Sequence, residues 1–195
     1  MVALAELRDE RWSILRKRVE ECLSAFNCAR SLHLQEFARS GVHKYEGDGH
    51  SRTYVLITPT DDESIDVAGF FTIGMAQLDL SEANKQVRKK LTGHISHSRT
   101  AAYSIAELAR DDRYTTAQLP GQTILNEAFT VIKRAQKFIG GRFLVVDARE
   151  AVMERLYKPA GFRVVGVATP PKGMEDVDFS TACCQIRDWA ESNGM

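Results

Sequence analysis

The feature that most constrains the fold is residues 101–146, where a strand, a glycine-containing turn, a helix and a second strand follow one another. Apolar residues of 121–139 recur at three- and four-residue steps, which places them on one helical face: Leu125, Ala128, Phe129, Ile132, Ala135 and Ile139. Gly140 and Gly141 are expected to end this helix. Residues 143–146 are wholly apolar, as expected for a strand buried on both faces. The order predicts a right-handed unit with two parallel strands.

The turn of this unit, residues 118–123, has the sequence QLPGQT. Backbone N–H groups at the start of a helix have no partner inside it, and the helix dipole adds a partial positive charge there. Such a turn can hold a phosphate group. Many α/β proteins turn here without binding anything, so a plain connection is the alternative.

A further helix is predicted after residue 147. Asp147 can cap it, with Glu150 three residues later in a box-like arrangement. This helix carries Val152, Leu156 and Tyr157 and is expected to end within KPAGF at 158–162.

The turn and the helix end together resemble the GNAT superfamily, the acyl-CoA-dependent N-acyltransferases. The family pattern Q-x-x-G-x-[G/A] is matched at Gln118 and Gly121, with Thr123 in the last place, and L-Y-x-x-x-G-F is matched in full by 156–162. The resemblance implies a single α/β domain with a mixed, twisted sheet and helices on both faces. It also implies acetyl-CoA-dependent acetylation of a primary amine by direct transfer, with acetyl-CoA as co-substrate and no metal.

The resemblance also implies site residues. Residues of the central strand and of the turn would hold the coenzyme, with backbone amides of the turn on its pyrophosphate: Leu108, Ala109, Arg110, Gln118, Leu119, Gly121, Gln122, Thr123 and Ile124. Tyr157 would protonate the departing thiolate. Pro120 has no N–H and Thr123 adds a side chain, which favours an alternative of another class, a binding or regulatory module that keeps the fold without catalysis.

Glu107 is the candidate base, because some GNAT enzymes carry a catalytic glutamate at this place on the central strand. An acidic residue in an otherwise apolar strand is costly unless it is paired. The alternative role is therefore a salt bridge to Arg110, Arg113 or a helix arginine.

Four stretches of the N-terminal half loosely resemble one GNAT branch, which includes toxin acetyltransferases of toxin–antitoxin modules that acetylate aminoacyl-tRNA. They are F-x-C at 26–28, L-x-x-F at 34–37, SRTYV at 51–55 and AGFFT at 68–72. Members commonly carry GRLAVD on the central strand, where this chain has AELARD, and they are commonly basic, whereas this chain has 26 basic and 26 acidic residues. Toxin-type acetylation of aminoacyl-tRNA is thus an alternative function.

The rest of the chain is expected to complete one domain over residues 1–195. Residues 6–26 form an amphipathic pattern, so an N-terminal helix within 1–25 is predicted to pack on the domain with an apolar stripe of Trp12, Leu15, Val19, Cys22 and Leu23. A second helical stretch covers 31–45. Strands are predicted at 53–58 and 67–78, joined as a hairpin through the acidic bend 61–63, and at 163–168 and 181–186 as an antiparallel pair.

The segment 81–99 is strongly basic, and its stretch from Lys85 to Arg99 is either a solvated helix and loop or a surface for an anionic partner. His94 and His97 have metal-ligand spacing but no third ligand nearby, so no metal site is predicted. The acceptor would be an amine on a small molecule, a peptide or a tRNA, and a homodimer is left open.

The cysteines, Cys22, Cys28, Cys183 and Cys184, show no zinc spacing and are expected to be reduced core thiols of a cytoplasmic protein. No membrane-spanning run and no signal-like N-terminus is apparent, so no membrane partner is predicted.

Overall fold

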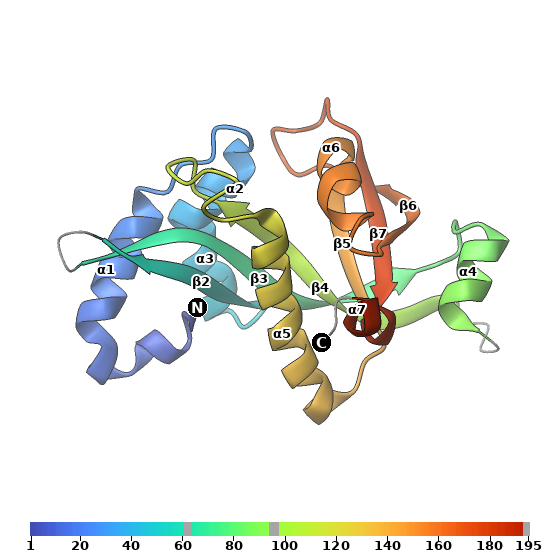
Figure 1. The fold of residues 1–195 in the computed structure, drawn as a ribbon, viewed down its shortest axis with the longest axis horizontal. Helices are drawn as coiled ribbons and strands as arrows, with labels where there is room; N and C mark the ends of the chain where they lie inside the picture. The colour runs from blue at the N-terminus through green and yellow to red at the C-terminus, as the bar shows by residue number, and fades with distance from the viewer. Residues whose placement is uncertain (61–63, 94–97, 193–195) are drawn as a thin grey trace. The chain divides into compact units, whose positions relative to one another are not determined.

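The computed structural model describes residues 1–60, 64–93 and 98–192. Within these ranges the strands form a seven-stranded sheet in the order β1-β2-β3-β4-β5-β7-β6 (Figure 1). The strands are β1 (Val2–Ala3), β2 (Ser51–Pro59), β3 (Ile65–Asp79), β4 (Arg99–Arg110), β5 (Phe143–Arg149), β6 (Arg163–Ala168) and β7 (Phe179–Gln185). β4 and β5 are parallel, whereas β2 with β3, β5 with β7 and β6 with β7 are antiparallel, so the sheet is mixed as predicted.

The helices match the sequence periodicity over residues 121–139, whereas the predicted stretches 6–26 and 31–45 are each divided into several helical elements. They are α1 (Ser13–Ser24), α2 (Leu32–Glu36), α3 (Val42–Gly47), α4 (Lys85–Thr92), α5 (Gly121–Ile139), α6 (Glu150–Val152) and α7 (Ile186–Ser192), with 3₁₀ turns η1 (Glu6–Arg8) and η2 (Glu10–Trp12) and π-helical turns η3 (Phe37–Gly41) and η4 (Met153–Tyr157). Among the described residues, no helix is both long enough and apolar enough to cross a bilayer.

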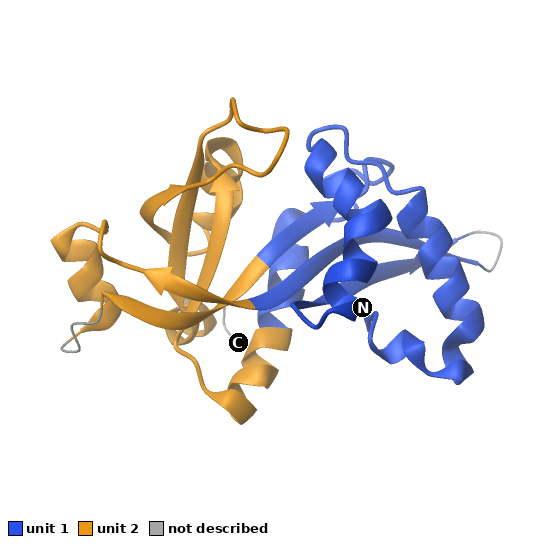
Figure 2. Ribbon diagram, turned by 180° about the vertical axis from the view of Figure 1, so that it is seen from behind, with its two compact units in different colours: residues 1–74, 106–130 blue, residues 75–105, 131–195 orange. Residues whose placement is uncertain are grey.

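The chain divides into two compact units (Figure 2), one of residues 1–74 and 106–130 and the other of 75–105 and 131–195. The prediction of one domain over residues 1–195 stays a prediction.

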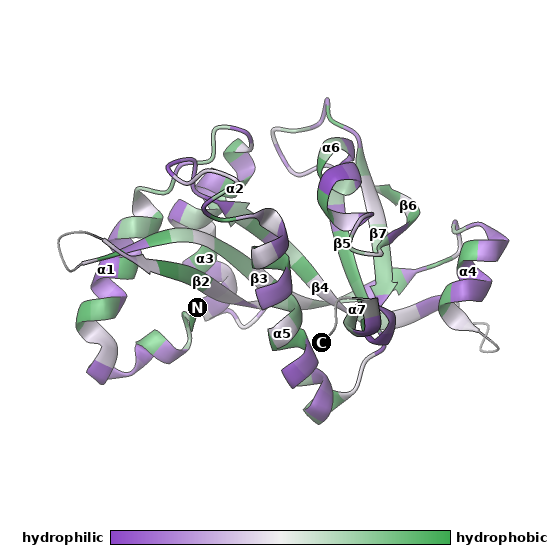
Figure 3. Ribbon diagram, in the orientation of Figure 1, coloured by the Kyte–Doolittle hydropathy of each residue, from purple (hydrophilic) through white to green (hydrophobic). Residues whose placement is uncertain are grey.

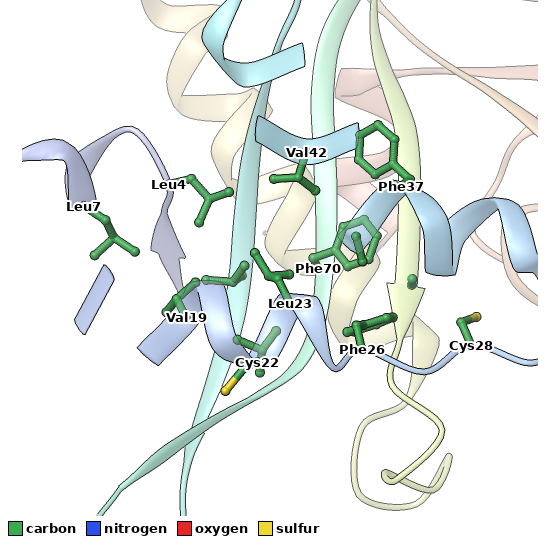
Figure 4. Packing of buried hydrophobic residues seen from close by; sticks show 14 residues of the cluster. Leu4, Leu7, Val19, Cys22, Leu23, Phe26, Cys28, Phe37, Val42 and Phe70 are labelled. Atoms are coloured by element: carbon green, nitrogen blue, oxygen red, sulfur yellow. The ribbon is translucent and has the colours of Figure 1, made fainter. Parts of the chain in front are cut away.

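The core of the first unit is an apolar cluster between the β2–β3 hairpin and the N-terminal helices (Figure 4). Phe70 of β3 is fully buried at its centre, with the Phe26 ring edge-on at 5.2 Å and the Phe37 ring stacked at 6.0 Å. Val19 and Leu23 of α1 join the same cluster. The apolar stripe of the N-terminal helix therefore stabilises this unit by burial, at about 1.5–3 kcal/mol for each large side chain.

The predicted single helix over 6–26 is wrong in its first part. The chain forms two 3₁₀ turns before α1, because the Asp9 side chain accepts a hydrogen bond from the Arg11 N–H and starts a separate turn. Trp12 belongs to the second of these turns and is 48% exposed, so it is not part of the buried stripe.

The core of the second unit is an apolar cluster in which β5, β6 and β7 are joined by Leu78 of β3, Ala102 of β4 and Leu91 of α4. In Figure 3, β5, β6 and β7 are mostly hydrophobic, whereas α4 also carries hydrophilic residues. β7 pairs with β5 over seven residues and with β6 on its other side, which confirms the predicted antiparallel pair. Cys183 and Cys184 are buried free thiols in β7. The helix α7 that follows β7 was not predicted.

The junction between α5 and β5 also lies in this unit. Gly141 adopts φ +107°, and a Cβ there would lie 2.5 Å from the Tyr103 ring, so the position favours glycine. The Tyr103 hydroxyl donates to the Gly140 carbonyl at 2.5 Å. The two glycines end α5 as predicted, and they also contact the ring and the hydroxyl group of Tyr103 on β4.

The predicted cap of the helix after β5 is wrong. β5 continues to Arg149, where no side-chain cap is formed, and the Asp147 carboxylate instead accepts a hydrogen bond from the Thr181 hydroxyl at 2.6 Å. Pairing with β7 extends the strand past the position that local capping rules favour. The acidic bend 61–63 and the pair His94 and His97 lie outside the described residues.

Candidate active site

The predicted coenzyme turn lies in the first unit, where the end of β4 meets the start of α5. A Cβ placed on Gly69 of β3 would lie 2.7 Å from the Ala109 carbonyl oxygen and 3.1 Å from the Leu119 side chain. Glycine at 69 therefore allows β3, the end of β4 and the turn to pack closely. Leu119 and Ile124 are buried, and their side chains anchor the two ends of the turn.

Side-chain hydrogen bonds fix the shape of the turn. The Gln118 amide oxygen accepts from both the backbone N–H and the hydroxyl of Thr115, at 2.8 and 2.9 Å. Arg110 Nη1 donates to the Leu119 carbonyl at 2.9 Å. Burial lowers the pKa of the Arg110 guanidinium. Gln118 and Arg110 thus hold the turn in one conformation.

The backbone N–H groups of the turn are used unequally. The N–H of Leu119 donates to the Thr115 carbonyl at 3.0 Å, and those of Thr123 and Ile124 donate to the Pro120 carbonyl at 3.0 and 3.4 Å. The N–H groups of Gly121 and Gln122 have no hydrogen-bond partner among the described residues. These two donors open a 19-residue helix, where an anion is favoured.

Glu107 pairs with a histidine. His33 Nε2 on α2 lies 2.8 Å from Glu107 Oε1, so the alternative of a salt bridge to an arginine is wrong. The hydrogen bond to Glu107 raises the pKa of His33, while burial opposes it. The pair therefore stabilises the folded chain fully below the ordinary His pKa of 6.5, and this contribution is lost as the pH rises through the raised pKa.

The arginines expected near Glu107 have other partners. Arg113 pairs with Asp111 at 2.9 Å and with Asp66 at 2.8 Å. Asp111 is fully buried and also accepts from the Asn27 N–H at 3.0 Å. Burial alone would raise the pKa of Asp111, but the hydrogen bonds from Arg113 and Asn27 lower it below its ordinary value. Sequence reasoning missed this cluster, although a carboxylate directly after a buried strand is a signal for it.

Tyr157, the predicted acid, lies in the second unit. It ends the π-helical turn η4, and its largely buried ring packs edge-on against Phe162 at 5.3 Å. π-helical turns are rare and often occur at functional sites. The helix ends at Tyr157, as predicted for KPAGF.

The basic segment forms α4, with Asn84 as its N-cap and Leu91 as its buried contact. Lys85, Lys89 and Lys90 are exposed on it. Arg99 pairs with Asp79 at 2.8 Å, which offsets one positive charge of the basic surface predicted for an anionic partner. Hydrogen bonds from Ser81 and Arg99 lower the pKa of Asp79 to about 2. Among the described residues, no three His, Cys, Asp or Glu side chains gather as metal ligands.

No family model and no curated protein matches the sequence. Solved structures do match the fold. A tyrosine-to-phenylalanine mutant of KacT is 15% identical, with 87% of this chain and 90% of that one covered and a TM-score of 0.65. AtaT complexed with acetyl-methionyl-tRNAfMet is 17% identical, with 85% and 88% covered and a TM-score of 0.62. A mutant AtaT toxin bound to the C-terminus of the antitoxin AtaR and acetyl-CoA is 17% identical, with 89% and 91% covered and a TM-score of 0.61.

The chain has the GNAT fold. The fold inferred from the turn and the LYKPAGF ending is confirmed, and so is the structural similarity to toxins of toxin–antitoxin modules. Within the GNAT fold, the turn before α5 and the end of η4 are the two places where the sequence predicts function.

Proposed function

We propose that this chain is an acetyl-CoA-dependent N-acetyltransferase that acetylates a primary amine. The observation that carries the proposal is the pair of N–H groups of Gly121 and Gln122, which have no partner among the described residues, at the start of a long helix after β4. The GNAT fold supports it, and so does the presence of acetyl-CoA in a structural neighbour.

The role proposed for each residue of the turn depends on whether its backbone N–H already has a hydrogen-bond partner. Gly121 and Gln122 would donate to the pyrophosphate directly. Leu119, Thr123 and Ile124 donate within the turn, so their role would be to hold its shape, together with the side chain of Gln118. The backbone of Leu108, Ala109 and Arg110 on β4 would position and polarise the thioester carbonyl.

The chemistry needs a neutral amine and a protonated leaving group. Acetyl-CoA supplies the acetyl group as a thioester. Glu107 would take a proton from the acceptor ammonium, directly or through a water, so that the amine lone pair can form the new C–N bond. Tyr157 would donate its hydroxyl proton to the sulfur as the C–S bond breaks.

A tRNA-borne amine is the more specific candidate acceptor. AtaT binds acetyl-methionyl-tRNAfMet and shares the fold of this chain. The exposed lysines of α4 would suit an RNA phosphate backbone. The zero net charge of the chain gives no support to broad nucleic-acid binding.

Transfer of labelled acetyl from acetyl-CoA tests the proposal, with methionyl-tRNAfMet, peptides and small amines as acceptors. We expect transfer to at least one acceptor, and a loss of about 100-fold in kcat for Tyr157→Phe with little change in acetyl-CoA affinity. Tyr103→Phe, on β4, is the matched control. Calorimetry with acetyl-CoA that shows no heat at millimolar concentration would favour a binding module without catalysis.

A further inference from the structure

The His33–Glu107 pair joins two segments that are 74 residues apart in the sequence. His33 comes from α2 and Glu107 from β4, and both side chains are partly buried, with 30% and 17% of their surfaces exposed. Among the described residues, the hydrogen bond to His33 is the one side-chain bond that Glu107 makes. Its second oxygen, Oε2, therefore keeps its lone pairs available for a substrate or a water.

We propose that His33 is a positioning residue that orients Glu107 as the base of the transfer reaction. The inference rests on the proposed function, because it assigns a role within that reaction. The hydrogen bond at Oε1 restricts rotation of the carboxylate and leaves Oε2 to accept the proton. In that step an N–H bond of the ammonium breaks and an O–H bond of Glu107 forms, with no change in oxidation state.

A histidine partner behaves differently from an arginine. The charge of arginine is permanent, whereas imidazole loses its proton near neutral pH. At 2.8 Å, an imidazolium gives the carboxylate a charged hydrogen bond, whereas neutral imidazole can still donate one neutral hydrogen bond to it. Loss of the His33 proton therefore changes the charge beside Glu107 while the orientation of the carboxylate is kept.

The surroundings of His33 fix the direction of its titration. Glu107 on β4 and Glu36 on α2 are the charged groups that act on it, and both favour the imidazolium. The centre of the Phe37 ring lies 6.4 Å from the centre of the His33 ring. The change of charge of His33 is thus expected above the ordinary pKa of histidine.

The variants H33A and H33Q separate positioning from packing. H33A removes the hydrogen bond, and we expect kcat for acetyl transfer to methionyl-tRNAfMet to fall about 10-fold or more, as is typical when the partner of a reactive group is removed. In H33Q an amide N–H can still donate to Oε1 but cannot titrate. We expect H33Q to recover most of kcat and to lose the step in the pH profile that belongs to His33.

The matched control is H43Q. His43 lies on the neighbouring α3, is exposed, and forms no ion pair among the described residues. We expect its kcat and pH profile to equal those of the wild type. A second measurement is independent of folding losses in H33A: in the NMR titration of the His33 ring, E107Q should lower its pKa relative to wild type.

Three results overturn the inference. Equal kcat and equal pH profiles in wild type, H33A and H33Q would reduce the pair to a structural contact, even if the melting temperature fell. An unchanged His33 titration in E107Q would show that the two groups are not coupled. If wild-type protein transfers acetyl to no acceptor, the proposed function fails and this inference fails with it, whereas transfer that is insensitive to His33 removes the inference alone.

Discussion

Two carboxylates lie four residues apart at the end of β4 and differ in how completely they are bonded. Asp111 is fully buried, and its two oxygens accept four hydrogen bonds between them, from Arg113 N, Nε and Nη2 and from Asn27 N, at 2.9–3.0 Å. The Glu107 side chain is 17% exposed, and only its Oε1 forms a side-chain hydrogen bond among the described residues, with His33.

The difference is the basis for giving Asp111 a structural role and for proposing a catalytic role for Glu107. A buried carboxylate whose acceptor positions are filled by its own chain has nothing left to offer a substrate, and it holds the loop after β4 to the segment around Asn27. A partly exposed carboxylate with one open oxygen can still take a proton. Their charge and their place at the end of the strand do not by themselves distinguish the two carboxylates.

The largest effect is expected for Asp111→Ala. The change leaves the Asn27 N–H without its acceptor and removes one of the two carboxylates that pair with Arg113, which keeps Asp66 and is 47% exposed. Because a buried donor is left unsatisfied and a charged hydrogen bond is lost, we expect a loss of about 3 kcal/mol of unfolding free energy. Urea unfolding measures it.

Asp112→Ala is the matched control. Asp112 accepts from the Ala29 N–H and from Arg30, but its side chain is more exposed, so its loss should cost about 1 kcal/mol. Equal losses of unfolding free energy in the two variants would mean that the four hydrogen bonds to Asp111 contribute no more to stability than the bonds to Asp112.

Glu107→Gln is expected to affect activity more than stability. The free energy of unfolding should change by about 1 kcal/mol or less, since an amide oxygen can still accept from His33. Acetyl transfer should fall by about 100-fold near pH 7 and by less as the pH rises, because the free amine then forms without a base. The ratio of wild-type to variant kcat between pH 7 and 9.5 measures this, and a constant ratio would indicate a structural role.

The smallest effect is expected for the loss of folding stability at low pH. Because the pKa of Asp111 is lowered on folding, its contribution is fully present above the unfolded value of 3.8 and is lost as the pH falls through the folded value. Thermal unfolding of the wild type should therefore show a drop in stability below about pH 4 that is smaller in Asp111→Asn. A drop of equal size in both would assign the acid sensitivity to other carboxylates.

The sequence was most informative where one local pattern decides the structure. The bounds of α5 and β6 and the end of η4 agree with the predictions, because periodicity and Gly pairs act over a few residues. Asp147 shows the limit of local patterns. Its position predicts a helix cap, but the strand continues past it because β5 pairs with β7, and no residue near Asp147 in the sequence indicates that pairing.

The site depended more on contacts that are distant in the sequence. Glu107 was singled out as an acid in an apolar strand, but its partner His33 is 74 residues away and could not be inferred without the fold. The same holds for the Asn27 N–H on Asp111, 84 residues away. The unequal use of the turn N–H groups also depends on the fold, because the sequence shows that Pro120 lacks an N–H but not that its carbonyl accepts hydrogen bonds.

An amide NMR titration of the protein with acetyl-CoA tests most directly whether the turn before α5 binds the coenzyme. We predict that the resonances of Gly121 and Gln122 shift most, that those of Thr123 and Ile124 shift less, and that Gly121→Pro, which removes one N–H at a position that tolerates proline, weakens binding about 10-fold relative to Gly121→Ala. Shifts confined to other residues, or equal affinities of the two variants, would contradict the claim that this turn binds the coenzyme.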